Sequence, residues 1–191
     1  MIPWISLASA SLTLCVLLRL SPQLFIAFTL LSLILLAIRE AYGRPLALGI
    51  CSGLALDIGG FLSPLMIIIP FLAYIKAPYV LLATALYSMA AATLAKPSPQ
   101  SLSLNVIAYS VPPTITSFIL LGANSLSVIP IASFLGVLIY GDLAYYLATY
   151  RSLNKTFIVG GAGGLDALVV CPAISTSIAI GLLSLATLLN T

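Results

Sequence analysis

Three aspartates stand inside apolar stretches of this 191-residue sequence, at Asp57, Asp142 and Asp166. An ionised carboxylate at the centre of a membrane helix costs about 2.5–3.5 kcal/mol, so such acids usually hold a proton, an ion or a substrate. The remaining acid, Glu40, follows Arg39 in a short basic loop, where we expect it to balance surface charge. The sequence has no histidine, and we expect no intramembrane cation to pair with the three aspartates.

Asp142 and Asp166 flank the short polar segment 151–157, which predicts a tight hairpin of two spans. Counted from the nearest basic loops at helical rise, all three aspartates would lie roughly 14–20 Å deep, near the middle of a hydrocarbon core about 30 Å thick. Two facing carboxyl groups would share a proton, as in aspartic proteases. The sequence leaves open whether they face each other. Tyr140 is close enough along the chain to hydrogen-bond an acid.

Each aspartate also has a structural interpretation. Asp57 could satisfy backbone N–H groups freed at a helix break, and Asp142 could join two helices through hydrogen bonds. Asp166 could cap the last helix, where free N–H groups and the helix dipole favour an anion. Glycines accompany two of these acids and would let a substrate or a neighbouring helix approach the backbone. They are Gly59 and Gly60 after Asp57, and Gly160, Gly161, Gly163 and Gly164 before Asp166.

The composition predicts one all-α polytopic domain, residues 1–191, embedded in a lipid bilayer. Hydrophobic residues make up 62% of the chain and charged residues only 6%, whereas soluble domains carry about a quarter charged residues. The basic residues fall between apolar segments and divide the chain into about seven transmembrane helices. The predicted spans are 3–18, 22–38, 45–75, 78–95, 101–122, 125–150 and 158–189.

Two of these spans are expected to be broken helices. The span 45–75 contains Gly59, Gly60 and Pro64, which predict two half-length helices joined near Asp57. The span 101–122 contains the pair Pro112–Pro113. Breaks at membrane depth survive only inside protein or beside a watery cavity, and transporters often build their binding sites at such breaks.

Basic residues concentrate on one side of this predicted topology, at Arg39, Arg44, Lys96, Arg151 and Lys155, against Arg19 and Lys76 on the other. The positive-inside rule then predicts a cell-membrane protein with a cytoplasmic N-terminus.

No metal, cofactor or nucleic-acid partner is expected. The three cysteines, Cys15, Cys51 and Cys171, sit in apolar segments without metal-ligand spacing, and we expect small buried side chains. The net charge of +3 is small and scattered, which is not typical of a nucleic-acid-binding surface.

The segments "LDIGGFLSP", "YGDL" and "GGAGGLDA" resemble, in order, the three motifs of domain-of-unknown-function family 1614, whose members are prokaryotic multi-pass membrane proteins. Asp57 stands where the family has Asn, while Asp142 and Asp166 are kept. This resemblance covers the chain from about residue 45 onward and implies a fold and a shared site rather than an activity. A weaker likeness to presenilin-like and prepilin-peptidase proteases, which carry Tyr-Asp and Gly-x-Gly-Asp, implies that Asp142 and Asp166 are catalytic.

Three functions fit the sequence. A proton- or cation-coupled transporter would bind its ion with Asp57, Asp142, Asp166 and Tyr140, and it is favoured because it uses Asp57 and both broken spans. A diaspartyl intramembrane protease would use Asp142 and Asp166 as general acid and base. A non-catalytic scaffold would use the aspartates to lock helix packing. Whether the protein is an enzyme, its substrate or ion, and its oligomeric state stay open.

Overall fold

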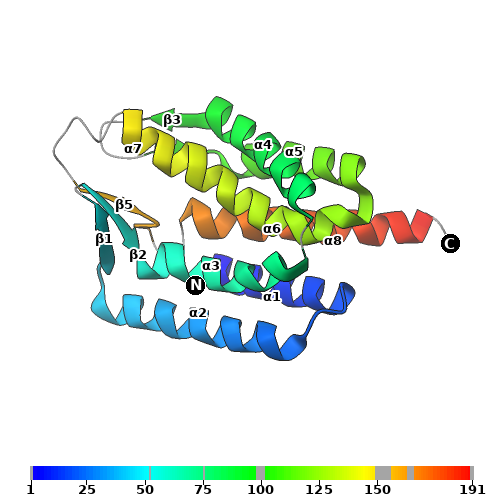
Figure 1. Ribbon diagram of the computed structural model, residues 1–191, viewed down its shortest axis with the longest axis horizontal. Coiled ribbons are helices and arrows are strands. Elements are labelled where there is room, and N and C mark those ends of the chain that lie inside the picture. The colour runs from blue at the N-terminus through cyan, green and yellow to red at the C-terminus, as the bar shows by residue number, and fades with distance from the viewer. Residues whose placement is uncertain are drawn as a thin grey trace.

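Apolar helices form a bundle that carries short strands at one end (Figure 1). The computed structural model describes residues 2–51, 53–74, 76–97, 102–148, 156–162 and 166–189. The first half contains α1 (Ile2–Leu17), α2 (Pro22–Tyr42), β1 (Ala47–Cys51), β2 (Leu54–Asp57), η1 (Ile58–Leu62), α3 (Ser63–Ile68), η2 (Ile69–Tyr74) and α4 (Ala77–Leu94). The second half contains β3 (Ala95–Pro97), β4 (Leu102–Leu104), α5 (Val106–Leu121), η3 (Gly122–Asn124), α6 (Ser125–Gly136), η4 (Val137–Leu143), α7 (Ala144–Ala148), β5 (Phe157–Val159) and α8 (Ala167–Leu189).

Several helical segments in the described residues are long and apolar enough to cross a membrane. Four such segments are Pro22–Tyr42, Ala77–Leu94, Val106–Ala148 and Ala167–Leu189, and Ile2–Leu17 and Ile58–Tyr74 are apolar but shorter. These lengths agree with an all-α integral membrane protein, because a hydrocarbon core about 30 Å thick needs about 20 helical residues. They do not establish seven crossing helices.

The distribution of side chains is also that of a membrane protein. Large aliphatic side chains face outward, with Leu30 and Ile34 on α2 each 54% exposed and Ile119 on α5 74% exposed. Hydroxyl side chains such as Ser117 and Thr176 are fully buried between helices. Small and hydroxyl residues at helix contacts are typical of membrane bundles, where lipid takes the place that water has around a soluble domain.

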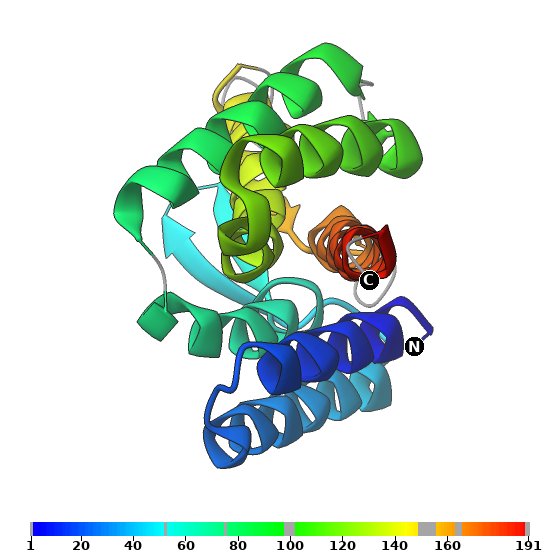
Figure 2. The same cartoon turned by 90° about the vertical axis from the view of Figure 1, so that its right-hand side faces the viewer.

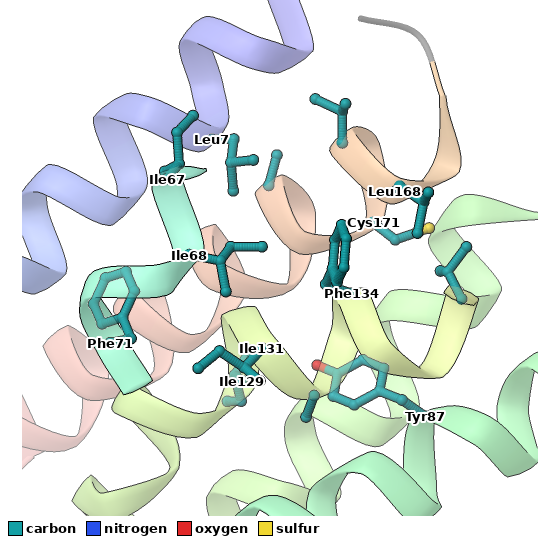
Figure 3. Packing of buried hydrophobic residues seen from close by; sticks show 14 of the residues in the cluster. Leu7, Ile67, Ile68, Phe71, Tyr87, Ile129, Ile131, Phe134, Leu168 and Cys171 are labelled. Atoms are coloured by element: carbon teal, nitrogen blue, oxygen red, sulfur yellow. The ribbon is translucent and has the colours of Figure 1, made fainter. Parts of the chain in front are cut away.

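Helix α8 lies between two groups of helices (Figure 2). On one side it packs against α1, which in turn contacts α2 and α3; on the other side it packs against α5 and α6, and α6 packs closely on α4. The buried core follows this arrangement: Figure 3 shows Tyr87 of α4, Phe134 of α6 and Cys171 of α8 gathered in one cluster. The start of α8, where Asp166 stands, is therefore held between both groups.

The predicted broken helix over 45–75 is wrong in its first half. Residues Ala47–Cys51 and Leu54–Asp57 form an antiparallel hairpin, and β2 also pairs in parallel with β5. From Ile58 the chain is helical as far as Tyr74. Pro64 lies directly after the π-helical turn η1, at the point where the helix changes to α3. The break at Asp57 is thus a change from strand to helix.

The predicted break at Pro112–Pro113 is also wrong, since α5 continues through both prolines. The fixed φ of proline is compatible with a helix, and the cost lies in the lost N–H groups. Packing of α5 against α4 and α8 offsets this cost. Thr114 Oγ1 also donates a hydrogen bond of 2.6 Å to the Ser110 carbonyl one turn earlier.

Candidate functional site

Asp142 and Asp166 line one pocket near the stranded end of the bundle. The pocket has a volume of about 240 Å³. Four elements contribute to its wall, namely β4, the start of α5, the η4 turn and the start of α8. The other lining residues are Leu104, Val106, Val137, Gly141, Ala162 and Ala167.

Asp142 is presented by a π-helical turn, η4, inserted between α6 and α7. Widened turns of this kind occur often at functional sites because they displace a side chain from its helical register. The Oδ2 atom of Asp142 is buried, and it has no hydrogen-bond partner among the residues that the structure describes. Such an oxygen needs a proton, an ion or a water molecule, because a buried polar atom left without a partner is costly.

Asp166 stands immediately before α8 and is held by two backbone donors. The Leu168 N–H donates to Oδ1 at 3.0 Å, and the Ala162 N–H donates to Oδ2 at 3.3 Å. The first of these bonds is a helix cap, so the capping role applies. The second ties the carboxylate to the turn that follows β5. Asp166 therefore combines a structural contact with a place in the pocket wall.

Asp57 does not line this pocket. It is fully buried and accepts hydrogen bonds from the Leu46 N–H at 2.8 Å and the Gly60 N–H at 2.9 Å, which caps the helical segment from Ile58. Arg39 Nε lies 3.6 Å from Asp57 Oδ2. The expectation that no cation pairs with the aspartates is therefore wrong for Asp57, because the last turn of α2 carries Arg39 back to it.

The glycines near the aspartates permit close contacts between segments far apart in sequence. A Cβ atom on Gly60 would lie 1.7 Å from the Gly160 carbonyl oxygen, and one on Gly59 would lie 2.7 Å from Arg39 Cγ. Gly160 also has a φ of +77°, which L side chains rarely adopt. Gly161 is less constrained, with 3.2 Å to the Ile158 oxygen. Gly163 and Gly164 lie outside the described residues.

The estimated depth of the aspartates rested on helical geometry, which two of them lack. A strand hairpin occupies 47–57 before Asp57, and β5 with its turn precedes Asp166. Both aspartates therefore stand at the starts of helices. Tyr140 is 46% exposed and is not part of the pocket wall. Within the described residues, no three His, Cys, Asp or Glu side chains lie close enough together to hold a metal ion.

Sequence reasoning missed two sets of contacts. It placed Arg39 in a basic loop between apolar segments, whereas the Arg39 side chain is only 14% exposed and contacts Asp57 and the Gly161 carbonyl. It also missed Trp4, whose Nε1–H lies 2.9 Å from both Ser32 Oγ and Ser63 Oγ. The position of Arg39 at a helix C-terminus gave no signal of either partner, since both contacts are long-range.

The described geometry thus separates the aspartates into a pair in one pocket, Asp142 and Asp166, and a single ion-paired capping residue, Asp57. No protein-family model, curated protein or solved structure matches the chain.

Proposed function

We propose that Asp142 and Asp166 form a diaspartyl acid–base pair that hydrolyses a peptide bond within the membrane. The observation that carries this proposal is that these two aspartates line one pocket, and that Asp142 Oδ2 has no partner in the described part of the chain. Two nearby carboxylates repel when both are ionised, so the pair is expected to retain one proton at neutral pH. A pair with one proton contains both a base and an acid.

The chemistry then needs only the pair and one water molecule. The carboxylate accepts a proton from the water as its oxygen attacks the peptide carbonyl carbon, and the carboxylic acid donates its proton to the carbonyl oxygen. The resulting gem-diol then collapses. The pair gives its proton to the peptide nitrogen, a hydroxyl of the diol returns a proton to the pair, and the C–N bond breaks. An amine and a carboxylic acid leave, and the pair again holds one proton. The pocket at about 240 Å³ has room for a water molecule beside a peptide group.

The structure weakens the reasons for preferring a transporter. That preference rested on three converging acids and two broken helices. Asp57 is instead neutralised by Arg39 and two backbone N–H groups, and α5 is continuous. Cation- or proton-coupled transport is nevertheless the second candidate, supported by the unpartnered Asp142 oxygen, since a pocket with two carboxylates can also bind a proton or a small cation. A scaffold role is supported for Asp57 and, through its helix cap, in part for Asp166.

The decisive experiment compares the wild-type protein with Asp142→Asn and Asp166→Asn, each purified in detergent. A pool of synthetic single-span peptides is incubated with each protein in H₂¹⁸O, and mass spectrometry searches for new C-termini that carry ¹⁸O. Asparagine has nearly the shape of aspartate but cannot act as an acid or a base. We expect cleavage by the wild type and none by either variant.

Either of two results would overturn the protease proposal. One is equal cleavage by the wild type and the Asn variants, and the other is no cleavage by the wild type. In the second case the same proteins are tested in liposomes loaded with a pH-sensitive dye under a cation gradient. Proton flux that requires Asp142 would establish coupled transport instead, whereas no flux would leave the scaffold role.

We also infer seven membrane-crossing segments, with the stranded end facing the cytoplasm of the cell. Three basic residues of the described chain support this orientation, since Arg39, Arg44 and Lys96 lie at the ends of helices nearest the strands. Arg19 and Lys76 lie in connections at the opposite ends of the helices. The resemblances to family 1614 and to the intramembrane aspartyl proteases stay predictions.

A further inference from the structure

We propose that Arg39 is a positioning residue that holds the glycine turn from which Ala162 donates to Asp166, and so sets the placement of that carboxyl group within the pair. This inference rests on the proposed role of Asp142 and Asp166. It starts from the observation that one side chain of α2 contacts two segments remote in sequence. These are Asp57, at the start of η1, and Gly161, in the turn before Asp166.

The contacts of the guanidinium group divide between its nitrogens. Nη2 donates a hydrogen bond of 3.3 Å to the Gly161 carbonyl, while Nε lies 3.6 Å from Asp57 Oδ2. Nη1 donates to Glu40 Oε1 at 3.0 Å. Nε itself makes no hydrogen bond in the described part of the chain, so its contact with Asp57 is an ion pair only. Because a guanidinium group is planar and rigid, the two hydrogen bonds and this ion pair together fix its orientation, and an ammonium group could not reproduce all three.

The turn held by Arg39 contacts the Asp166 carboxylate through a backbone hydrogen bond. The next residue after Gly161 is Ala162, whose N–H donates to Asp166 Oδ2 at 3.3 Å. On the other side, Gly160 packs against Gly60 so closely that a Cβ on either would clash with backbone atoms. The turn is therefore held by the Gly60 backbone at one residue and by Arg39 at the next, and its third residue contacts the carboxylate.

The absence of a side chain at Gly59 makes room for the Arg39 side chain. A Cβ atom on Gly59 would approach Arg39 Cγ to 2.7 Å and both Cβ and Cδ to 2.9 Å. The stem of Arg39 thus packs directly on the backbone of η1. Asp57 anchors the guanidinium group, which leaves Nη2 aimed at Gly161.

The test uses the small number of aspartates in the chain. Protein labelled with ¹³C at the aspartate carboxyl carbon gives signals from three residues, and Asp142→Asn and Asp166→Asn assign two of them. The ¹³C shift is followed against pH in wild type, Arg39→Ala, Arg39→Lys and the control Arg44→Ala, which removes an exposed arginine at the same end. Trp4 fluorescence checks that each variant is folded.

We expect Arg39→Ala to raise the titration midpoint of Asp166 by about half a pH unit or more, because the Ala162 N–H no longer stabilises the charged form. Arg39→Lys keeps the charge but cannot hold the turn, so it should move the midpoint in the same direction, whereas Arg44→Ala should not. A wild-type midpoint in Arg39→Lys would overturn the proposal, because the arginine would then act only through its charge. An unchanged midpoint in folded Arg39→Ala would overturn it as well.

The titration requires no substrate, so its outcome is separate from that of the peptide-cleavage experiment. If the protease proposal were refuted, a shifted Asp166 midpoint would still be evidence that Arg39 positions the turn. Conversely, the wild type could cleave peptides while the Asp166 midpoint is the same in wild type and Arg39→Ala. That result would retain the diaspartyl site and refute its positioning by Arg39.

Discussion

A close approach of two backbone segments predicts the effect of Gly60→Ala. A Cβ atom on residue 60 would lie 1.7 Å from the Gly160 carbonyl oxygen, whereas real Cβ atoms essentially never approach a non-bonded heavy atom within 3.0 Å. The two segments must therefore separate by at least about 1.3 Å. No side-chain rotation can relieve the contact, because the Cβ atom and the carbonyl oxygen are both fixed directly to the backbone.

Such a separation would disturb contacts on both sides of the glycine pair. Gly60 N–H caps the helix by donating to Asp57 Oδ2, and Gly160 follows β5, which pairs with β2. Inserting one methylene into a packed core costs typically 1–3 kcal/mol where side chains can adjust. Since backbone must move here, we expect Gly60→Ala to lower the free energy of unfolding by at least about 3 kcal/mol.

The assay is equilibrium unfolding in detergent micelles with increasing SDS, followed by the fluorescence of Trp4, the single tryptophan of the chain. Trp4 is a suitable reporter because its indole N–H contacts Ser63 Oγ at 2.9 Å, three residues after the substituted site. Gly181→Ala is the matched control. A Cβ atom on Gly181 meets nothing within 4 Å, so alanine should stabilise α8 by about 0.5–1 kcal/mol. Wild-type stability in Gly60→Ala would refute the close approach.

The same unfolding assay tests three further contacts. Tyr109→Phe should cost about 1 kcal/mol, because the Ser133 carbonyl loses a buried hydroxyl donor at 2.7 Å; no loss would contradict the bond. Ser63→Ala should cost about 1–2 kcal/mol and shift the emission of Trp4 in the folded protein, because the indole N–H loses the Ser63 hydroxyl. Unchanged emission would contradict this contact. Asp57→Asn should cost about 2–4 kcal/mol, since it removes the buried counter-ion of an arginine that is only 14% exposed and leaves that arginine with the half-exposed Glu40; a cost that vanishes in high salt would indicate a solvated pair instead.

Several features of the molecule follow from local sequence, and the structure agrees with them. The scarcity of charge and the length of the apolar runs predicted membrane-crossing helices, because these properties depend on composition and not on contacts. The predicted spans 3–18, 22–38 and 78–95 lie close to α1, α2 and α4. Asp57 was predicted to mark an interruption, and there the chain changes from strand to helix.

Two expectations failed because tertiary contacts overrode local preference. Residues 47–57 were assigned to the first half of a broken helix, because they belong to an apolar span that is too long for one plain helix. Pairing of β2 with β5, more than 100 residues away, satisfies part of that backbone. Likewise, Pro112 and Pro113 remain helical because α4 and α8 pack against α5.

The sequence by itself determined the class of the protein and the identity of its acidic residues, since burying so much apolar surface without charge leaves a bilayer as the natural solvent. Which of the three aspartates line one pocket was decided by the tertiary structure alone. The three aspartates all stand in apolar sequence, but different segments pack around them in the fold. Arg39 contacts Asp57, while β4 and the start of α5 enclose Asp142 and Asp166. Local sequence does not indicate such long-range neighbours. They are what distinguishes Asp142 and Asp166, which line one pocket, from Asp57, which is an ion-paired helix cap.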